Sequence, residues 1–98
     1  DIYPIFQASG CVGCHSTQFS NLNTLLSVQA GDYNSSSSGA NMPWLTPGEP
    51  LLSYLYHKVE GTHASVGGSG SQMPKNQPAL SSSTILEIGI WIDAGCQP

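Results

Sequence analysis

The stretch QASGCVGCHSTQ, residues 7–18, gathers two thiols and an imidazole in a chain that has few other reactive side chains. Cys11 and Cys14 are separated by two residues, and His15 follows the second thiol directly. The third and last cysteine, Cys96, lies near the other end of the chain. Three cysteines cannot all pair with one another in one chain, so any chemistry that uses Cys11 and Cys14 together leaves Cys96 over.

The C-x-x-C-H pattern of these residues is typical of covalent haem c attachment. Two thiols at this spacing reach neighbouring vinyl groups on one edge of a porphyrin, and the histidine beside the second thiol is then held under the iron. The pattern therefore predicts thioether bonds at Cys11 and Cys14 and an axial iron bond from His15. A hydrogen bond from the other ring nitrogen of His15 would fix its tautomer.

Three other interpretations of the two thiols remain open. Cys11 and Cys14 could form a structural disulfide, which would leave the histidine incidental. A thioredoxin-like redox pair needs a βαβ context, and the sequence has no strand-like pattern to provide one. A zinc site needs four ligands, so it would have to recruit two from Cys96, His57 and His63, and no second paired knuckle exists. The haem interpretation is preferred.

The second axial ligand has four candidates. Met42 and Met73 both precede proline, and His57 and His63 are the remaining histidines. Met73 is preferred because it lies in a loop shortly before the last predicted helix, which would anchor one end of that loop. Met42 follows a Ser-rich loop and is expected at the porphyrin edge or on the surface. His57 is expected to be partly exposed on a helix, and His63 to be solvated in a loop.

Apolar residues at helical spacing predict an all-α chain with three or four short helices and long loops. The helical segments are expected within DIYPIFQASG (1–10), SNLNTLLSV (20–28), TPGEPLLSYLYHKVEG (46–61) and LSSSTILEIGIWIDAGCQP (80–98). The third should run without a break from Pro50 to Gly61. Its buried face is expected to be Leu51, Leu52, Leu55 and Val59. The Ser-rich segment before it, and the Gly- and Ser-rich segment after it, are expected to be loops.

The last predicted helix carries the clearest signals. Ser81 is a plausible N-cap, and Gly95 a natural stop. Ile85, Ile88 and Ile92 would share its core face, with Gly89 between them. A glycine there costs about 1 kcal/mol of helix stability relative to alanine, so its presence predicts the close approach of another helix.

Length and charge restrict the class of protein. With 98 residues the chain is expected to be one domain, residues 1–98. The net charge is −4, and Lys58 and Lys75 are the only basic residues, which argues against nucleic acid as a partner. No apolar run approaches the roughly 20 residues that span a bilayer. The start at Asp1 indicates a processed or trimmed form that has lost a leader.

Four segments together give a family resemblance. CVGCH (11–15), PGEPLLSYLYHKVEG (47–61), QMPKNQPALS (72–81) and ILEIGIWIDAGC (85–96) resemble class I monohaem cytochromes c, above all small bacterial domains that occur alone or fused to larger proteins. The resemblance implies a cytochrome c-like fold of three to four helices wrapped around one haem. It implies His15 and Met73 as axial ligands, and crossed terminal helices in which Gly89 contacts Phe6 or Gly10.

Two features depart from that family. The first proline after the haem motif is Pro43, so the usual carbonyl acceptor for the N–H group of His15 has no counterpart. Cys96 occupies a position where a small apolar residue is usual. It could be a buried thiol or an exposed one that joins two chains, and its place near the C-terminus favours exposure.

The function expected from these features is that of an electron carrier, not an enzyme. The carrier would exchange single electrons with transient protein partners in the periplasm or on the outer surface of a bacterium. Scattered acidic residues would favour a basic partner surface. Two alternatives remain: a five-coordinate haem sensor or peroxidase with His63 as a distal base, and the electron-entry domain of a larger redox enzyme.

Overall fold

The computed structural model describes residues 3–8, 10–11, 22–27, 42–68, 71–74 and 77–97. In this part of the chain every regular element is helical and no strand is present, which confirms the predicted all-α class. The α-helices are α1 (Tyr3–Ala8), α3 (Leu22–Ser27), α4 (Tyr54–Glu60) and α5 (Ser82–Asp93). Two short 3-10 helices are η2 (Pro50–Leu52) and η3 (His63–Val66).

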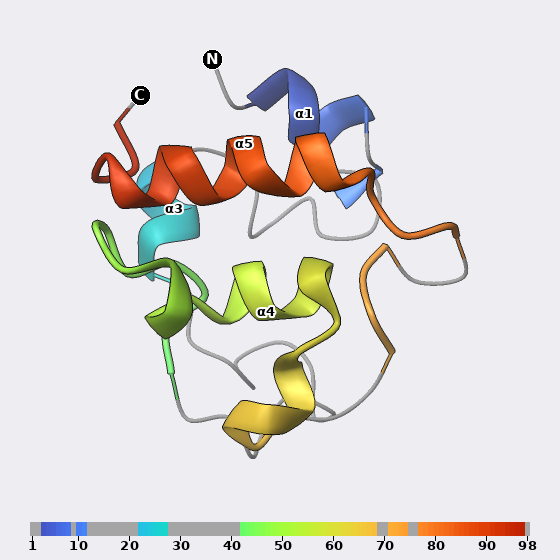
Figure 1. Ribbon diagram of the computed structural model, residues 1–98. Helices are drawn as coiled ribbons and strands as arrows, with labels where there is room; N and C mark the ends of the chain where they lie inside the picture. The colour runs from blue at the N-terminus through green and yellow to red at the C-terminus, as the bar shows by residue number, and fades with distance from the viewer. Residues whose placement is uncertain are drawn as a thin grey trace.

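The helices surround one apolar core. In Figure 1, α5 runs across the upper part of the molecule, α1 lies against it, and α4 runs below it. The core draws its buried side chains from every α-helix and from the segments beside them: Phe6, Leu25, Leu45, Leu55, Val59, Ile88, Ile92 and Cys96. The core therefore lies between α5 and α4, with α1 and α3 closing it.

The final helix forms as the sequence predicts. Ser81 is its N-cap, and the Ser81 hydroxyl accepts a hydrogen bond of 3.2 Å from the backbone N–H of Thr84. Such a cap satisfies one of the N–H groups that a helix start leaves without a partner. Ile88 and Ile92 are fully buried and Ile85 half-buried, so the predicted core face is confirmed.

Gly89 is the point of closest approach between two helices, but the neighbour is not the predicted one. A Cβ atom on Gly89 would lie 3.0 Å from Cε1 of Tyr56, which belongs to α4. The predicted contact with Phe6 or Gly10 is wrong, because α4 and not α1 packs on this face. The α1 helix contacts α5 elsewhere, through an edge-to-face pair of Phe6 and Trp91 with ring centroids 6.0 Å apart.

The third predicted helix is broken at Ser53. Ser53 has an extended backbone between η2 and α4, with φ −109° and ψ 111°. Its buried hydroxyl turns back, accepting from the Thr46 N–H at 2.8 Å and donating to the Glu49 carbonyl at 2.9 Å. A serine that bonds to nearby backbone in this way competes with helix continuation. The segment from Pro50 to Gly61 is therefore two short helices.

The break changes which side chains are buried. Leu55 and Val59 face the core as predicted, but Leu51 and Leu52 on η2 are 67% and 52% exposed. Beyond the break, the first N–H groups of α4 need acceptors outside the helix. The carbonyls of Pro43 and Trp44 accept from Tyr54 and Leu55, both at 2.9 Å.

The end of α4 forms as the sequence predicts, but the segment after it does not. Gly61 closes α4 with a left-handed φ of +82°, as the sequence predicts. The following segment was expected to be entirely loop, yet residues 63–66 form η3. The Ser-rich loop prediction falls on residues 29–43, of which 29–41 lie outside the described residues, and Met42 and Pro43 belong to no helix.

Candidate functional site

One thiol of the C-x-x-C-H motif can be placed. Cys11 is half-buried and packs against the core cluster, beside α1, whose Phe6 is buried in that cluster. Cys14 and His15 lie outside the described residues, so the thioether and axial-ligand assignments for them stay predictions. The packing of Cys11 nevertheless shows that the motif starts at the edge of the apolar core.

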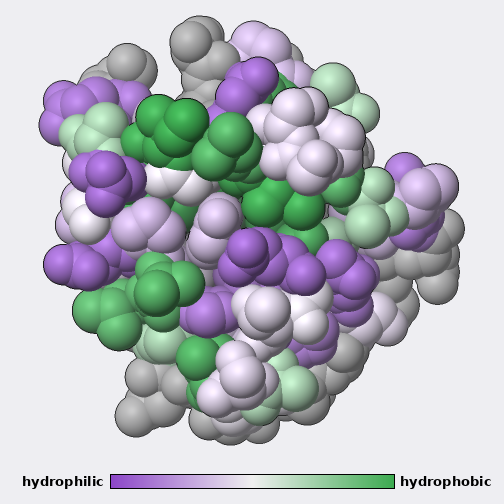
Figure 2. All heavy atoms as spheres, in the orientation of Figure 1, coloured by the Kyte–Doolittle hydropathy of each residue, from purple (hydrophilic) through white to green (hydrophobic). Residues whose placement is uncertain are grey.

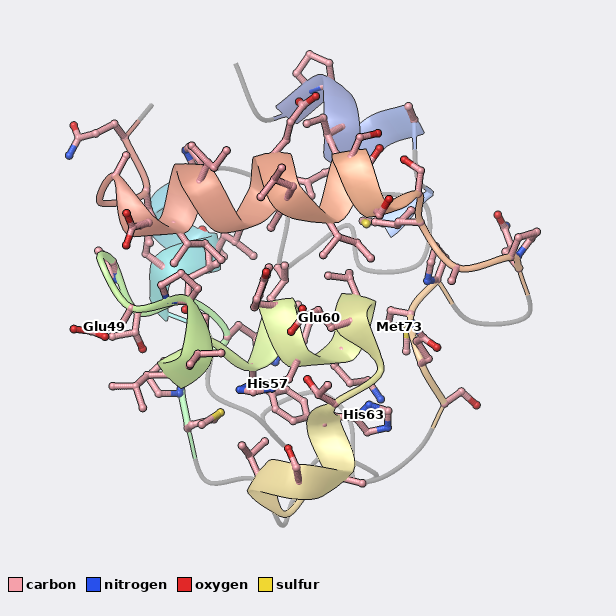
Figure 3. The ribbon with its side chains drawn as sticks, in the orientation of Figure 1. Glu49, His57, Glu60, His63 and Met73 are labelled. Carbon is pink, nitrogen blue, oxygen red and sulfur yellow. The ribbon has the colours of Figure 1, made fainter. Side chains whose placement is uncertain are left out.

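Hydrogen bonds join the segment that contains Met73, the preferred second axial ligand, to the last turn of α4. The Met73 backbone N–H donates to the Lys58 carbonyl at 3.0 Å. The side-chain amide of the preceding residue, Gln72, donates to the Val59 carbonyl, also at 3.0 Å. Met73 is half-buried and packs against the same core cluster as Cys11. The two carbonyls therefore fix the loop that presents the Met73 thioether (Figure 3).

The structure thus brings both describable residues of the predicted haem site onto one core. In Figure 1 the segment at residues 10–11 and the segment at 71–74 lie on the same side of the view, beside the start of α5. Met42, the alternative thioether, is also half-buried but is not among the residues packed on the core cluster. This contrast keeps Met73 as the preferred ligand.

A buried hydroxyl on α4 marks a place for an acceptor. Tyr54 is 1% exposed, and its hydroxyl has no hydrogen-bond partner among the described residues. A buried polar group without a partner costs about 1–3 kcal/mol. A carboxylate would satisfy this hydroxyl, and a haem carries two carboxylates. The site residues that can be described therefore fit a haem: a thiol and a thioether on an apolar core, and a buried donor one helical turn from the carbonyl that holds Met73.

Lys58 adds positive charge beside that hydroxyl. It lies one turn after Tyr54 on α4, with Nζ 6.0 Å from the centroid of the Tyr54 ring. The side chain is 6% exposed, and burial lowers the pKa of its ammonium group from the ordinary value. Sequence reasoning assigned no site role to Tyr54 or Lys58. The only indication in the sequence was their i, i+4 spacing on a predicted helix, which places the two side chains on one face.

His57 is buried, so the expectation of a partly exposed side chain is wrong. It is 5% exposed, because η2 folds back over this face of α4. Nε2 lies 2.8 Å from the Leu51 carbonyl and Nδ1 lies 2.7 Å from the Thr62 hydroxyl. Since a carbonyl can only accept, Nε2 donates and Nδ1 accepts from Thr62. Both ring nitrogens are engaged, so iron could bind His57 only by breaking one of these bonds.

His63 is also buried rather than solvated. It is the first residue of η3 and is 8% exposed. The expectation failed because the loop after α4 folds into a 3-10 turn that covers the imidazole. Figure 3 shows His63 below the end of α4, on the same side of the view as Met73.

Cys96 is buried, contrary to the expectation of exposure. It is 3% exposed and part of the core cluster, and burial raises the pKa of its thiol to about 11. The chain folds back after α5: the Cys96 N–H donates to the Trp91 carbonyl at 3.0 Å, and the Trp91 indole donates to the Gln97 carbonyl at 2.7 Å. A disulfide between two chains would require this turn to open.

The zinc alternative gains no support. No three His, Cys, Asp or Glu side chains cluster within the described part of the chain, so Cys11, Cys96, His57 and His63 do not assemble a ligand set there. In the same residues no helix is long and apolar enough to cross a membrane. No family model matches the sequence, and no curated protein or solved structure is similar enough to it to count as a match.

Proposed function

We propose that this protein is a monohaem c-type cytochrome that carries single electrons between redox proteins outside the cytoplasm. The C-x-x-C-H motif is the sequence basis of the proposal. The structural observation that carries it is the attachment of Met73 to the Lys58 carbonyl, on the same apolar core that Cys11 contacts. In this proposal Cys11 would be one thiol anchor and Met73 the thioether ligand, and their contact with one core supports it.

Each residue has a stated part in holding the group. Cys11 and Cys14 would attach the porphyrin through thioethers, and His15 and Met73 would occupy the two axial positions of the iron. Tyr54 would donate its buried hydroxyl to a haem carboxylate. Haem bound in this way supplies a one-electron couple at its iron. With both axial positions filled by side chains no position is open to a substrate, which favours a carrier over an enzyme.

The hydrogen bonds that hold the Met73 loop in place favour electron transfer. Two hydrogen bonds tie residues 72 and 73 to the end of α4, so the thioether keeps its place when the oxidation state changes. The buried core side chains exclude water from this side of the site. A dry surrounding disfavours extra charge on the cofactor and thereby tunes its potential. Partner proteins would meet the carrier in small, short-lived contacts.

The burial of His63 favours one second candidate. If Met73 did not bind iron, one axial position would be open, and the buried imidazole of His63 would be the candidate distal base. The protein would then bind a peroxide or a small gas and act as a sensor or peroxidase. Coordination at the Met73 side therefore decides between the two functions.

The test compares two methionine variants of the purified protein. Met73→Ala should abolish the weak long-wavelength absorption band by which ferric class I cytochromes report a methionine–iron bond. Met42→Ala is the matched control and should keep the band, because Met42 does not pack on the core cluster. A band lost only in the Met42 variant would contradict the ligand assignment. A wild-type protein that lacks the band would favour the sensor or peroxidase.

A further inference from the structure

The α5 helix is apolar on two opposite sides. Its inward side buries Ile88 and Ile92, while its outward side exposes Leu86 and Ile90, each 59% accessible to solvent. Large apolar side chains gathered on an exposed surface often mark an interaction site. No described residue covers this outward side, so α5 exposes an apolar surface to solvent.

A second exposed apolar pair adjoins α5. Leu51 and Leu52 on η2 point outward, and η2 contacts α5. The turn before η2 is tied to the end of α5, because the Gly48 N–H donates to the Ile92 carbonyl at 2.7 Å. Figure 2 shows apolar surface over α5 and over η2 on the same side of the molecule, with more polar side chains between the two areas. We name Leu51, Leu52, Leu86 and Ile90 the α5–η2 face.

Hydrogen bonds from buried side chains hold the backbone of η2, which carries two residues of the α5–η2 face. His57 on α4 donates from Nε2 to the Leu51 carbonyl at 2.8 Å. The buried Ser53 hydroxyl bonds to the Glu49 carbonyl at 2.9 Å, at the other end of η2. These bonds fix η2 with its two leucines directed to solvent, so their exposure is built into the fold. A preorganised surface loses little freedom when a partner binds it.

Only acidic side chains carry charge around this face. Glu87 and Asp93 are exposed on α5, and Glu49 is exposed directly before η2. Lys58, the single lysine in the described part of the chain, is buried. The α5–η2 face therefore has apolar side chains with an acidic rim and no exposed cation among the residues that can be described.

We propose that the α5–η2 face is a docking site for a protein whose own contact surface is apolar with a basic rim. Charge complementarity selects this occupant. A second copy of the chain would bring one acidic rim against another, and an anionic lipid surface would repel the same carboxylates. The apolar contacts supply affinity, and the carboxylates supply orientation and encounter rate.

The docking site is separate from the candidate haem site. Figure 3 places Glu49 and Met73 on opposite sides of α4. The α5–η2 face uses none of the residues assigned to the haem site, so the proposal does not depend on the proposed electron-transfer function. A change in docking with an unchanged optical spectrum would distinguish the two.

The test uses two synthetic amphipathic helical peptides with the same leucine face, one bearing lysines and the other glutamates. Binding to the purified protein is followed by calorimetry and by amide shifts in NMR spectra. The lysine peptide should bind at least about tenfold more tightly than the glutamate peptide and should shift residues of η2 and α5. Ile90→Ser should weaken it by about tenfold, because a buried isoleucine contributes that much to affinity.

Charge variants provide the matched control. Glu87→Lys should weaken the lysine peptide severalfold, whereas Glu60→Lys changes the net charge equally at an exposed position outside the face and should have a smaller effect. Equal binding of both peptides, or of both charge variants, would overturn the basic-rim assignment. Absence of binding, self-association through α5 in sedimentation, or binding to anionic vesicles abolished by Ile90→Ser would overturn the proposal itself.

Discussion

The two sides of α5 make opposite predictions for the same chemical change. Ile92 is 0% exposed in the core, and Ile90, two positions earlier, is 59% exposed. Isoleucine to alanine removes the same atoms at each position. Transfer of about 0.8 kcal/mol for each lost carbon, together with the cavity left behind, places Ile92→Ala at a loss of about 2–5 kcal/mol in the free energy of unfolding.

The matched variant should behave differently. Ile90→Ala removes little buried area, and alanine is the better helix former, so the free energy of unfolding should change by less than about 0.5 kcal/mol. For a chain of this size each kcal/mol moves Tm by roughly 4–8 °C. Ile92→Ala should therefore melt at least about 6 °C lower than Ile90→Ala.

Chemical unfolding followed by far-UV circular dichroism measures both variants. The urea midpoint should fall for Ile92→Ala with an unchanged m value, since the same surface is exposed on unfolding. Equal losses at the two positions, or a larger loss at Ile90, would refute the orientation of α5. In that event Ile90 would not be an exposed side chain, and the docking site proposed at the α5–η2 face would be contradicted as well.

Three further predictions concern single side chains. Burial raises the pKa of the Cys96 thiol from its ordinary value of 9.0 to about 11, so its stabilising contribution is full below pH 9.0 and is lost as pH rises towards 11. Alkylation of the native protein should be slow, and rapid labelling near neutral pH would contradict its burial. Tyr54→Phe should lower the stability of the haem-loaded protein by about 1–3 kcal/mol if the hydroxyl serves a haem carboxylate, whereas a gain in Tm would show that it has no acceptor. Ser81→Ala should cost about 1 kcal/mol through loss of the bond from Thr84, with Ser82→Ala as the control, and equal melting of the two variants would argue against the cap.

Sequence patterns predicted the structure correctly where a helix end or a buried helix face depends only on residues close together in the chain. The Ser81 cap and the isoleucine spacing of α5 involve only near neighbours in the sequence, and the structure confirms both. Gly61 ends α4 for the same reason. The glycine at position 89 correctly indicated a close approach, but its partner is set by which helix packs there. That choice depends on the whole fold and has no local signal.

The errors share a physical cause. Ser53 breaks the third predicted helix by bonding to the backbone of residues 46 and 49, and the resulting fold of η2 exposes two leucines and buries His57. A side chain that bonds to the backbone of the preceding turn overrides helix propensity, and such bonds cannot be read from hydrophobic spacing. His63 and Cys96 were misplaced similarly, because the turns that cover them form only on the completed core.

The proposed haem site stays a prediction. The sequence suggested Cys11 through its motif and Met73 through its place in a loop before the last helix, and the fold packs both against one core. The hydrogen bonds of residues 72 and 73 to the end of α4 were not foreseeable, because they join segments that the sequence shows only as a loop and a helix. No site role was assigned to Tyr54 from the sequence. Its unsatisfied hydroxyl emerges only from its surroundings.

The central claim is covalent attachment of haem through Cys11 and Cys14, and mass spectrometry tests it most directly. The intact protein, purified from a host that matures c-type cytochromes, should carry the mass of one haem in excess of the polypeptide. After proteolysis that excess should reside on the peptide containing residues 7–18. An intact mass equal to the bare chain, or lower by the two hydrogens of a disulfide, would contradict the account.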